Sequence, residues 1–252
     1  MSKIYSVPGE TGSPKINTKS VADFFNSRAE KISTLGPIQA VIYQDKHPAL
    51  AAKRNIAEKT KLLPFLQLDG TQRVLDVGCG TGRWAENLLP MSSWYHGLDA
   101  CEGLITHARK QFANVTHGRF TVASADDYSL ETLNEDQCFN RILCAGVLIY
   151  LNEDAALRAL RCMASVLARK GLVLLREPVG IYRRLTICEH YSDDMEQDYS
   201  AIYRTRDELD ALILKAMPKN SFRLVASGDV YEEESLNNRT DTKQQWLLLE
   251  KA

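Results

Sequence analysis

The sequence of 252 residues lacks long apolar runs and has almost no net charge. None of its apolar runs approaches the roughly 20 residues that a helix needs to span a bilayer, and its N-terminus has no apolar core of signal-peptide length. Lysine and arginine (31) nearly balance aspartate and glutamate (32), whereas a duplex nucleic-acid binder usually carries a basic face. We therefore expect a cytoplasmic protein that binds neither membranes nor nucleic acids.

Cysteine pairs with metal-ligand spacing are also missing. The six cysteines lie at positions 79, 101, 138, 144, 162 and 188, and none of them forms a C-x-x-C pair. This spacing gives neither a common zinc motif nor a disulfide framework, and free thiols suit a reducing compartment. The adjacent acids Asp193 and Asp194 resemble half of a magnesium site, but such pairs more often form a solvated turn. We expect no metal.

What the sequence does have is a glycine turn between an apolar strand and a helix. Residues 73–77 read as a buried strand, Gly78 and Gly80 follow it, and a helix is expected from about Arg83. Glycines let a ligand approach the backbone closely, and a helix N-terminus favours a negative group. Asp99 ends a second apolar run at the distance at which an acid can accept both hydroxyls of a ribose. The pattern predicts a nucleoside-containing ligand.

The residues of this turn resemble the first motif of class I S-adenosylmethionine-dependent methyltransferases. That motif is an acid followed by three glycines at alternate positions, and Asp76, Gly78, Gly80 and Gly82 fill it in register. Dinucleotide-binding folds space their glycines G-x-G-x-x-G instead. The resemblance covers residues 72–178. It implies S-adenosylmethionine as cofactor, S-adenosylhomocysteine as product, and a Rossmann-like α/β fold with a seven-stranded mixed sheet of order 3-2-1-4-5-7-6, helices on both faces and an N-terminal helical cap.

The alternation of strand and helix patterns independently predicts a parallel sheet. We expect a polar tail and helical cap over 1–68, a methyltransferase core over 69–252, and a substrate-covering insertion at about 178–205. Within the cap, a helix over 48–63 would turn Ala52, Ile56 and Leu63 inward, and a long helix is expected over 152–169. The expected core strands are residues 73–77, 95–98, 120–123, 141–145, 172–175, 222–226 and 245–249.

The resemblance implies a partner for the amino-acid tail of the cofactor. The loop of Gly78, Cys79 and Gly80 offers backbone contacts. Arg83 offers a bidentate partner for the carboxylate, because protein N-terminal methyltransferases have an arginine at this place. Asp76 is expected either to order the loop or to meet the cofactor's ammonium group through water.

The nucleoside half of the cofactor has its own candidates. Asp99 is the expected ribose ligand, and Ala100 would line the adenine. The family usually places an aspartate after the third strand, where this sequence has Ser124. The Ser124 hydroxyl and the Ala125 N–H group can take over its contacts to adenine, whereas a slip of two residues would put Asp126 there.

Three further residues are candidates for contact with the cofactor. Cys144 ends the fourth expected strand, where the fold places residues beside the reactive methyl group. Tyr43 and Arg54 belong to the N-terminal segments that cap the cofactor pocket in this family. Plain packing of Tyr43 and solvation of Arg54 are the alternatives for these two.

The catalytic candidates depend on the acceptor. An alcohol or phenol needs a base, whereas an amine needs only to be deprotonated. Histidine is the side chain that most often serves as such a base, and His190 lies in the aromatic insertion. Glu177, at the end of the fifth strand, and Glu189 are alternatives, and Tyr203 is expected to contact the acceptor.

Three functions follow from the sequence. The first is methyl transfer to an oxygen or nitrogen atom of a small polar molecule, such as a sugar, a glycan precursor or a natural-product intermediate. The second is methylation of a peptide or protein, suggested by Gly82 and Arg83 and by the acidic stretch over 189–198. The third is binding of S-adenosylmethionine without catalysis. The tyrosines and arginines of the insertion would also suit a homodimer interface.

Overall fold

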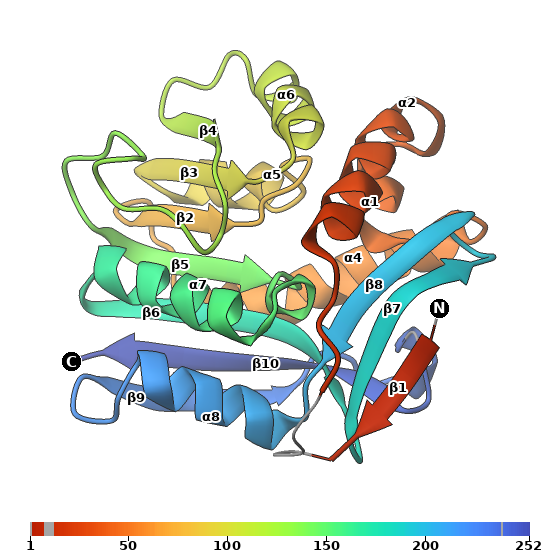
Figure 1. Ribbon diagram of the computed structural model, residues 1–252. Helices are drawn as coiled ribbons and strands as arrows, with labels where there is room; N and C mark the ends of the chain where they lie inside the picture. Colours follow the sequence, from red (N-terminus) through yellow and green to blue (C-terminus); the bar gives the residue numbers. More distant parts are fainter. Residues whose placement is uncertain (1, 8–12, 238) are drawn as a thin grey trace.

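The structure, a computed structural model, describes residues 2–7, 13–237 and 239–252. The protein is built on a seven-stranded sheet (Figure 1). Its strand order is β4-β3-β2-β5-β6-β10-β9, which is the predicted order 3-2-1-4-5-7-6. β10 runs antiparallel to both of its neighbours, and the other pairs are parallel. The strands are β2 (Arg73–Val77), β3 (Trp94–Asp99), β4 (Gly118–Val122), β5 (Phe139–Ala145), β6 (Leu167–Gly180), β9 (Phe222–Asp229) and β10 (Thr242–Lys251).

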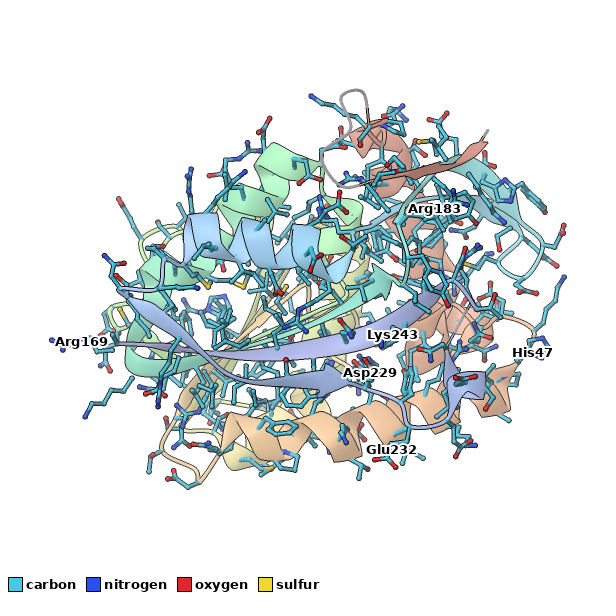
Figure 2. The ribbon with its side chains drawn as sticks, turned by 90° about the horizontal axis from the view of Figure 1, so that it is seen from below. His47, Arg169, Arg183, Asp229, Glu232 and Lys243 are labelled. Atoms are coloured by element: carbon cyan, nitrogen blue, oxygen red, sulfur yellow. The ribbon has the colours of Figure 1, made fainter. Side chains whose placement is uncertain are left out.

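Helices cover both faces of this sheet, because its strands bury alternate residues on opposite sides. Leu75 and Val77 pack in the core under α7 and α8, whereas Val74 packs in the core under α4, α5 and α6. Figure 2 shows α8 and α4 on opposite sides of the strands, with the ion pair between Asp229 and Lys243 (3.0 Å) joining β9 to β10. The helices are α4 (Pro48–Leu62), α5 (Ala85–Leu88), α6 (Glu102–Gln111), α7 (Glu153–Val166) and α8 (Arg206–Ala216), with the 3₁₀ turns η1 (Leu63–Leu66), η2 (Leu89–Met91), η3 (Leu148–Tyr150) and η4 (Glu234–Leu236).

The insertion predicted at about 178–205 contains two strands of a second, three-stranded sheet. β7 (Arg184–Ser192) and β8 (Gln197–Tyr203) form an antiparallel pair, and β1 (Ser2–Ser6) adds to the free edge of β7. The expected N-terminal tail thus contains a strand over residues 2–6, and residues 8–12 lie outside the described part of the chain. Pairing with β1 satisfies backbone groups that β7 would otherwise expose as an edge strand.

Three short helices cap the carboxyl edge of the large sheet. α1 (Thr18–Glu30) lies against β8 on one side and α6 on the other (Figure 1), and α2 (Ile32–Leu35) and α3 (Pro37–Ile42) follow it. Arg28 is fully buried on α1 and donates to both carboxylate oxygens of Asp45 at 2.7 Å and to the carbonyl oxygen of Ala40. This buried ion pair fixes the chain between α3 and α4 against α1.

The structure corrects the predicted inward face of α4. Ala52 is exposed, and Ile56 is 64% exposed. The residues turned inward are mostly polar, and they include Arg54, Asn55 and Glu58. Apolar periodicity failed here because this face of the helix meets charged groups of the core, among them Arg83 and Arg176.

The long helix also ends earlier than predicted. α7 stops at Val166 and β6 begins at Leu167, which pairs with Phe139 of β5. Lys170 takes a left-handed φ of 57° within the irregular start of this strand. Among the described residues, no helix combines the length and the hydropathy needed to cross a membrane.

Candidate functional site

A cavity of about 580 Å³ opens at the carboxyl ends of the core strands, between the large sheet and its cap. Its volume lies within the usual range of small-molecule sites. Its walls come from the glycine loop after β2, the ends of β3 and β5, the helices α1 and α3, and the strands β6 and β8. In open α/β sheets this edge is where ligands bind.

The glycine loop forms the floor of the cavity, and its backbone requires glycine. Gly78 and Gly80 line the cavity with φ values of 72° and 55°. A Cβ on Gly78 would lie 2.3 Å from Cγ2 of Val147, and one on Gly82 would lie 2.7 Å from the ring of Phe112. The loop therefore brings bare backbone to the cavity, where a ligand can approach it closely.

Asp99 meets this loop from the end of β3. Its carboxylate accepts from the backbone N–H of Gly80 at 3.0 Å and from that of Cys101 at 2.8 Å. Burial raises the pKa of Asp99, and these two N–H groups oppose the rise. Asp99 and Ala100 both line the cavity, together with Cys79 of the loop. A carboxylate with two bound donors keeps free lone pairs, so Asp99 can still accept from ligand hydroxyls.

Two of the predicted cofactor residues lie behind the cavity wall. Asp76 is 1% exposed, does not line the cavity, and accepts a hydrogen bond of 2.8 Å from the hydroxyl of Tyr95. Burial raises the pKa of Asp76 to about 7. Cys144 is fully buried at the end of β5 and does not line the cavity either. Both residues support the floor from below.

Both alternatives for the adenine end are present in the wall. Ser124 and Ala125 follow β4 and line the cavity, and so does Asp126. The hydroxyl of Ser124 donates to Asp126 at 2.5 Å, and Arg158 pairs with the second oxygen of the same carboxylate. The two candidates are thus one hydrogen-bonded unit at this end.

The opposite end of the cavity holds three arginines. Arg83 donates to Asn55 at 2.9 Å and to Glu58 at 3.2 Å, and Arg176 donates to Glu58 at 2.6 Å. Burial alone would raise the pKa of Glu58, but Arg176 and Arg83 outweigh it and hold that pKa below its ordinary value. The third cation, Arg54, comes from the polar face of α4. These charged groups explain why α4 turns a polar face inward.

The predicted cap residues Tyr43 and Arg54 both line the cavity. Tyr43 ends α3 in a left-handed conformation with a φ of 61°, and its ring packs edge-on against Phe24 and Phe25. Burial raises the pKa of Tyr43 to about 12. A non-glycine residue with this backbone is uncommon, and such strain clusters at functional sites.

Three tyrosine hydroxyls form a row in the part of the cavity wall that β8 and η3 provide, which we call the roof. The hydroxyl oxygens of Tyr150 and Tyr199 lie 3.4 Å apart, and those of Tyr199 and Tyr203 lie 3.1 Å apart. All three tyrosines line the cavity, among them Tyr203, which was predicted to contact the acceptor. The wall also includes Arg176, which the sequence analysis missed although it directly precedes the candidate Glu177.

The predicted base candidates Glu177 and His190 do not line this cavity. Glu177 is 2% exposed and accepts the backbone N–H groups of Val147, Leu148 and Ile149 at 2.9, 3.0 and 3.3 Å, so it orders the turn after β5. His190 lies on β7, outside the wall. Among the described residues, no histidine, lysine or glutamate lines the cavity.

Comparisons with known proteins agree with this geometry. Residues 74–171 match the profile of a family described as "Methyltransferase domain". The chain is 29% identical over 140 residues to nodulation protein S of Sinorhizobium fredii, which covers 51% of this chain and 62% of that protein.

Solved structures share the fold. Phosphoethanolamine N-methyltransferase 1 of Haemonchus contortus, in complex with phosphoethanolamine and S-adenosylhomocysteine, superposes with a TM-score of 0.69 at 16% identity, over 94% of this chain and 50% of that one. The N-methyltransferase NodS of Bradyrhizobium japonicum, with bound S-adenosylhomocysteine, superposes with a TM-score of 0.58 at 14% identity, over 90% of this chain and 98% of that one. At these identities the likeness demonstrates a common fold. The chain spans half of the nematode enzyme and less than two thirds of the nodulation protein.

Proposed function

We propose that residues 74–171, which match the profile of a methyltransferase domain, form a class I S-adenosylmethionine-dependent methyltransferase domain, and that the protein transfers the methyl group of S-adenosylmethionine to a nitrogen or oxygen atom of a small polar molecule. The observation that carries the proposal is the cavity, which runs from the glycine loop and Asp99 to the tyrosine row and the arginines. One enclosed space can therefore hold a cofactor and a small acceptor in contact.

The residues of the floor suit S-adenosylmethionine. Gly78 and Gly80 present backbone where a Cβ would intrude, and Asp99 offers oxygen lone pairs for the ribose hydroxyls. Ser124 and Ala125 bound the adenine end. The cofactor supplies a methyl group on a sulfonium, which is already a good electrophile. The work left to the chain is positioning and exclusion of water.

Arg83 is our candidate for the carboxylate of the cofactor's tail. Asn55 and Glu58 hold its guanidinium group beside the glycine loop, and the group lines the cavity. A planar guanidinium suits bidentate binding of a carboxylate. Asp76 acts from behind the loop, where it keeps the strand end and Tyr95 in place.

The acceptor side has few groups that could remove a proton. Since no histidine, lysine or glutamate of the described chain lines the cavity, an acceptor that needs no strong base fits it best. A neutral amine meets that condition. Two of the similar proteins are named N-methyltransferases, which points the same way.

Labelled cofactor tests this function. The protein is incubated with S-adenosylmethionine carrying a labelled methyl group and with cell extract separated by size. We expect label in the small-molecule fraction and none with Asp99→Asn, while Asp193→Asn, an exposed acid outside the cavity, behaves as wild type. Label in the peptide fraction would favour a peptide methyltransferase. Cofactor binding without label in any fraction would favour a non-catalytic binding protein.

A further inference from the structure

We propose that Arg54 and Arg176, together with Tyr231 and Gln244, form a subsite that holds the acceptor by an anionic group, a phosphate or a carboxylate. Arg54 comes from α4, Arg176 from β6, Gln244 from β10, and Tyr231 from the segment that follows β9. All four side chains line the cavity. This inference rests on the proposed function, because it assigns the remainder of the cavity to the acceptor.

Arg176 lines the cavity beside the end of β5. Gly146 follows β5 with a φ of 76°, and a Cβ on it would lie 2.8 Å from Nη1 of Arg176. The guanidinium group therefore lies directly against the backbone at the end of β5. Gln244 faces this region from β10, in register with Pro178 of β6. An anion bound here would be close to the turn that follows β5.

Positive charge is in excess at this end of the cavity. Glu58 is the carboxylate that pairs with Arg83 and with Arg176, at 3.2 and 2.6 Å. No carboxylate of the described residues lies within ion-pair distance of Arg54, whose Nε donates only to the carbonyl oxygen of Leu236 at 2.7 Å. Buried charges are normally paired, so a cluster that shares one carboxylate between Arg83 and Arg176 and leaves Arg54 without one calls for a ligand of negative charge.

The acids elsewhere in the wall do not offset this excess. Asp99 accepts from two backbone N–H groups at the floor, and Asp126 pairs with Arg158 at the adenine end. The amino-acid tail of the cofactor carries both a carboxylate and an ammonium group, so it adds no net negative charge. The acceptor is the remaining source of an anion.

Unpaired donors mark the same two arginines. Arg54 is 4% exposed, yet its Nη1 has no hydrogen-bond partner, and Nε of Arg176 also has none. Leaving a buried donor unpaired costs free energy, so both guanidinium groups keep hydrogen-bonding capacity that the chain itself does not use. Tyr231 lines the same cavity, and its hydroxyl is a further donor that can serve an anion there.

Binding of small anions to the protein saturated with S-adenosylhomocysteine tests this subsite. The probes are inorganic phosphate, acetate and the neutral acetamide, titrated at constant ionic strength and followed by calorimetry or ligand-observed NMR. We expect at least one of the two anions to bind and acetamide not to bind, and the two anions separate a phosphate subsite from a carboxylate subsite. Arg54→Gln and Arg176→Gln should each weaken that binding about tenfold, and Arg54→Lys should restore part of it.

The controls separate this inference from the cofactor site. Arg206→Gln removes an arginine outside the cavity and should leave anion binding unchanged, and thermal unfolding checks that each variant is folded. Binding of neither anion would overturn the subsite, as would anion binding that survives Arg54→Gln. Loss of S-adenosylhomocysteine affinity in Arg54→Gln as large as that in Arg83→Gln would assign the cluster to the cofactor. A wild-type protein without affinity for S-adenosylhomocysteine would contradict the proposed function itself.

Discussion

The backbone N–H of Gly80 donates to the Asp99 carboxylate at 3.0 Å, and this bond joins the glycine loop after β2 to the end of β3. It holds bare backbone and an acidic acceptor side by side on the floor of the cavity. Those are the two features that a ribose and an amino-acid tail require on adjacent strands.

Replacing Asp99 by Asn should weaken binding of S-adenosylhomocysteine. The change keeps the side-chain shape but removes a charged acceptor, and hydrogen bonds to charged groups contribute about 1.5–3 kcal/mol each. We expect a loss of affinity of at least tenfold by calorimetry, with Asp193→Asn unchanged. Unaltered affinity in a folded Asp99→Asn variant would show that the ribose binds elsewhere.

Arg83→Gln should distinguish ligands that have the amino-acid tail from those that lack it. The guanidinium group lies at the end of the loop and is held by Asn55 and Glu58. We expect S-adenosylhomocysteine to bind at least about tenfold more weakly, because a bidentate carboxylate contact is lost. The affinity for 5′-methylthioadenosine, which has no tail, should stay the same. An equal loss for both ligands would mean that Arg83 acts on the loop rather than on the carboxylate.

Asp76 gives a dependence of stability on pH. Burial raises its pKa in the folded state from 3.8 to about 7, so the folded protein keeps a proton that the unfolded chain has released. This stabilisation is complete below the unfolded pKa and is lost as the pH rises through the folded pKa. The contribution to the free energy of unfolding should therefore fall by about 1.4 kcal/mol per pH unit between these two pKa values.

Urea unfolding of the ligand-free wild type and Asp76→Asn at several pH values isolates this contribution. The variant keeps a neutral side chain that can still accept from Tyr95, so it should lack the slope. A difference between the two proteins that stays constant from about pH 5 to pH 7 would contradict the buried, protonated carboxyl.

The roof tyrosines should affect turnover more than affinity for the cofactor. Tyr203→Phe removes a hydroxyl that lines the cavity and lies 3.1 Å from that of Tyr199. We expect a lower rate of label transfer with unchanged affinity for S-adenosylhomocysteine. His190→Ala, outside the cavity wall, should leave both quantities unchanged. A loss of turnover in His190→Ala would restore the histidine as a candidate base.

The sheet and the floor of the site could be predicted from the sequence because local rules fix them. An apolar strand followed by glycines at alternate positions has few structural alternatives to a strand, a tight turn and a helix. Asp99 closes the next apolar run, so it is expected at the end of the next strand. The order of the strands followed from the family resemblance and agrees with the structure.

The walls could not be predicted because they depend on distant contacts. The polar inner face of α4 makes sense only once Glu58 meets Arg83 and Arg176 from other elements. Similarly, Arg176 and Glu177 are adjacent on β6, and the sequence pattern indicated the acid as a candidate base. In the fold the arginine lines the cavity, whereas the acid binds the backbone after β5.

Calorimetric titration of the purified wild-type protein with S-adenosylmethionine, S-adenosylhomocysteine and NADH tests the central claim most directly. We predict that both adenosyl ligands bind at a single site, that NADH does not bind, and that Asp99→Asn weakens the adenosyl ligands. Binding of NADH without binding of S-adenosylmethionine or S-adenosylhomocysteine would contradict the assignment of this cavity as a methyl-donor site.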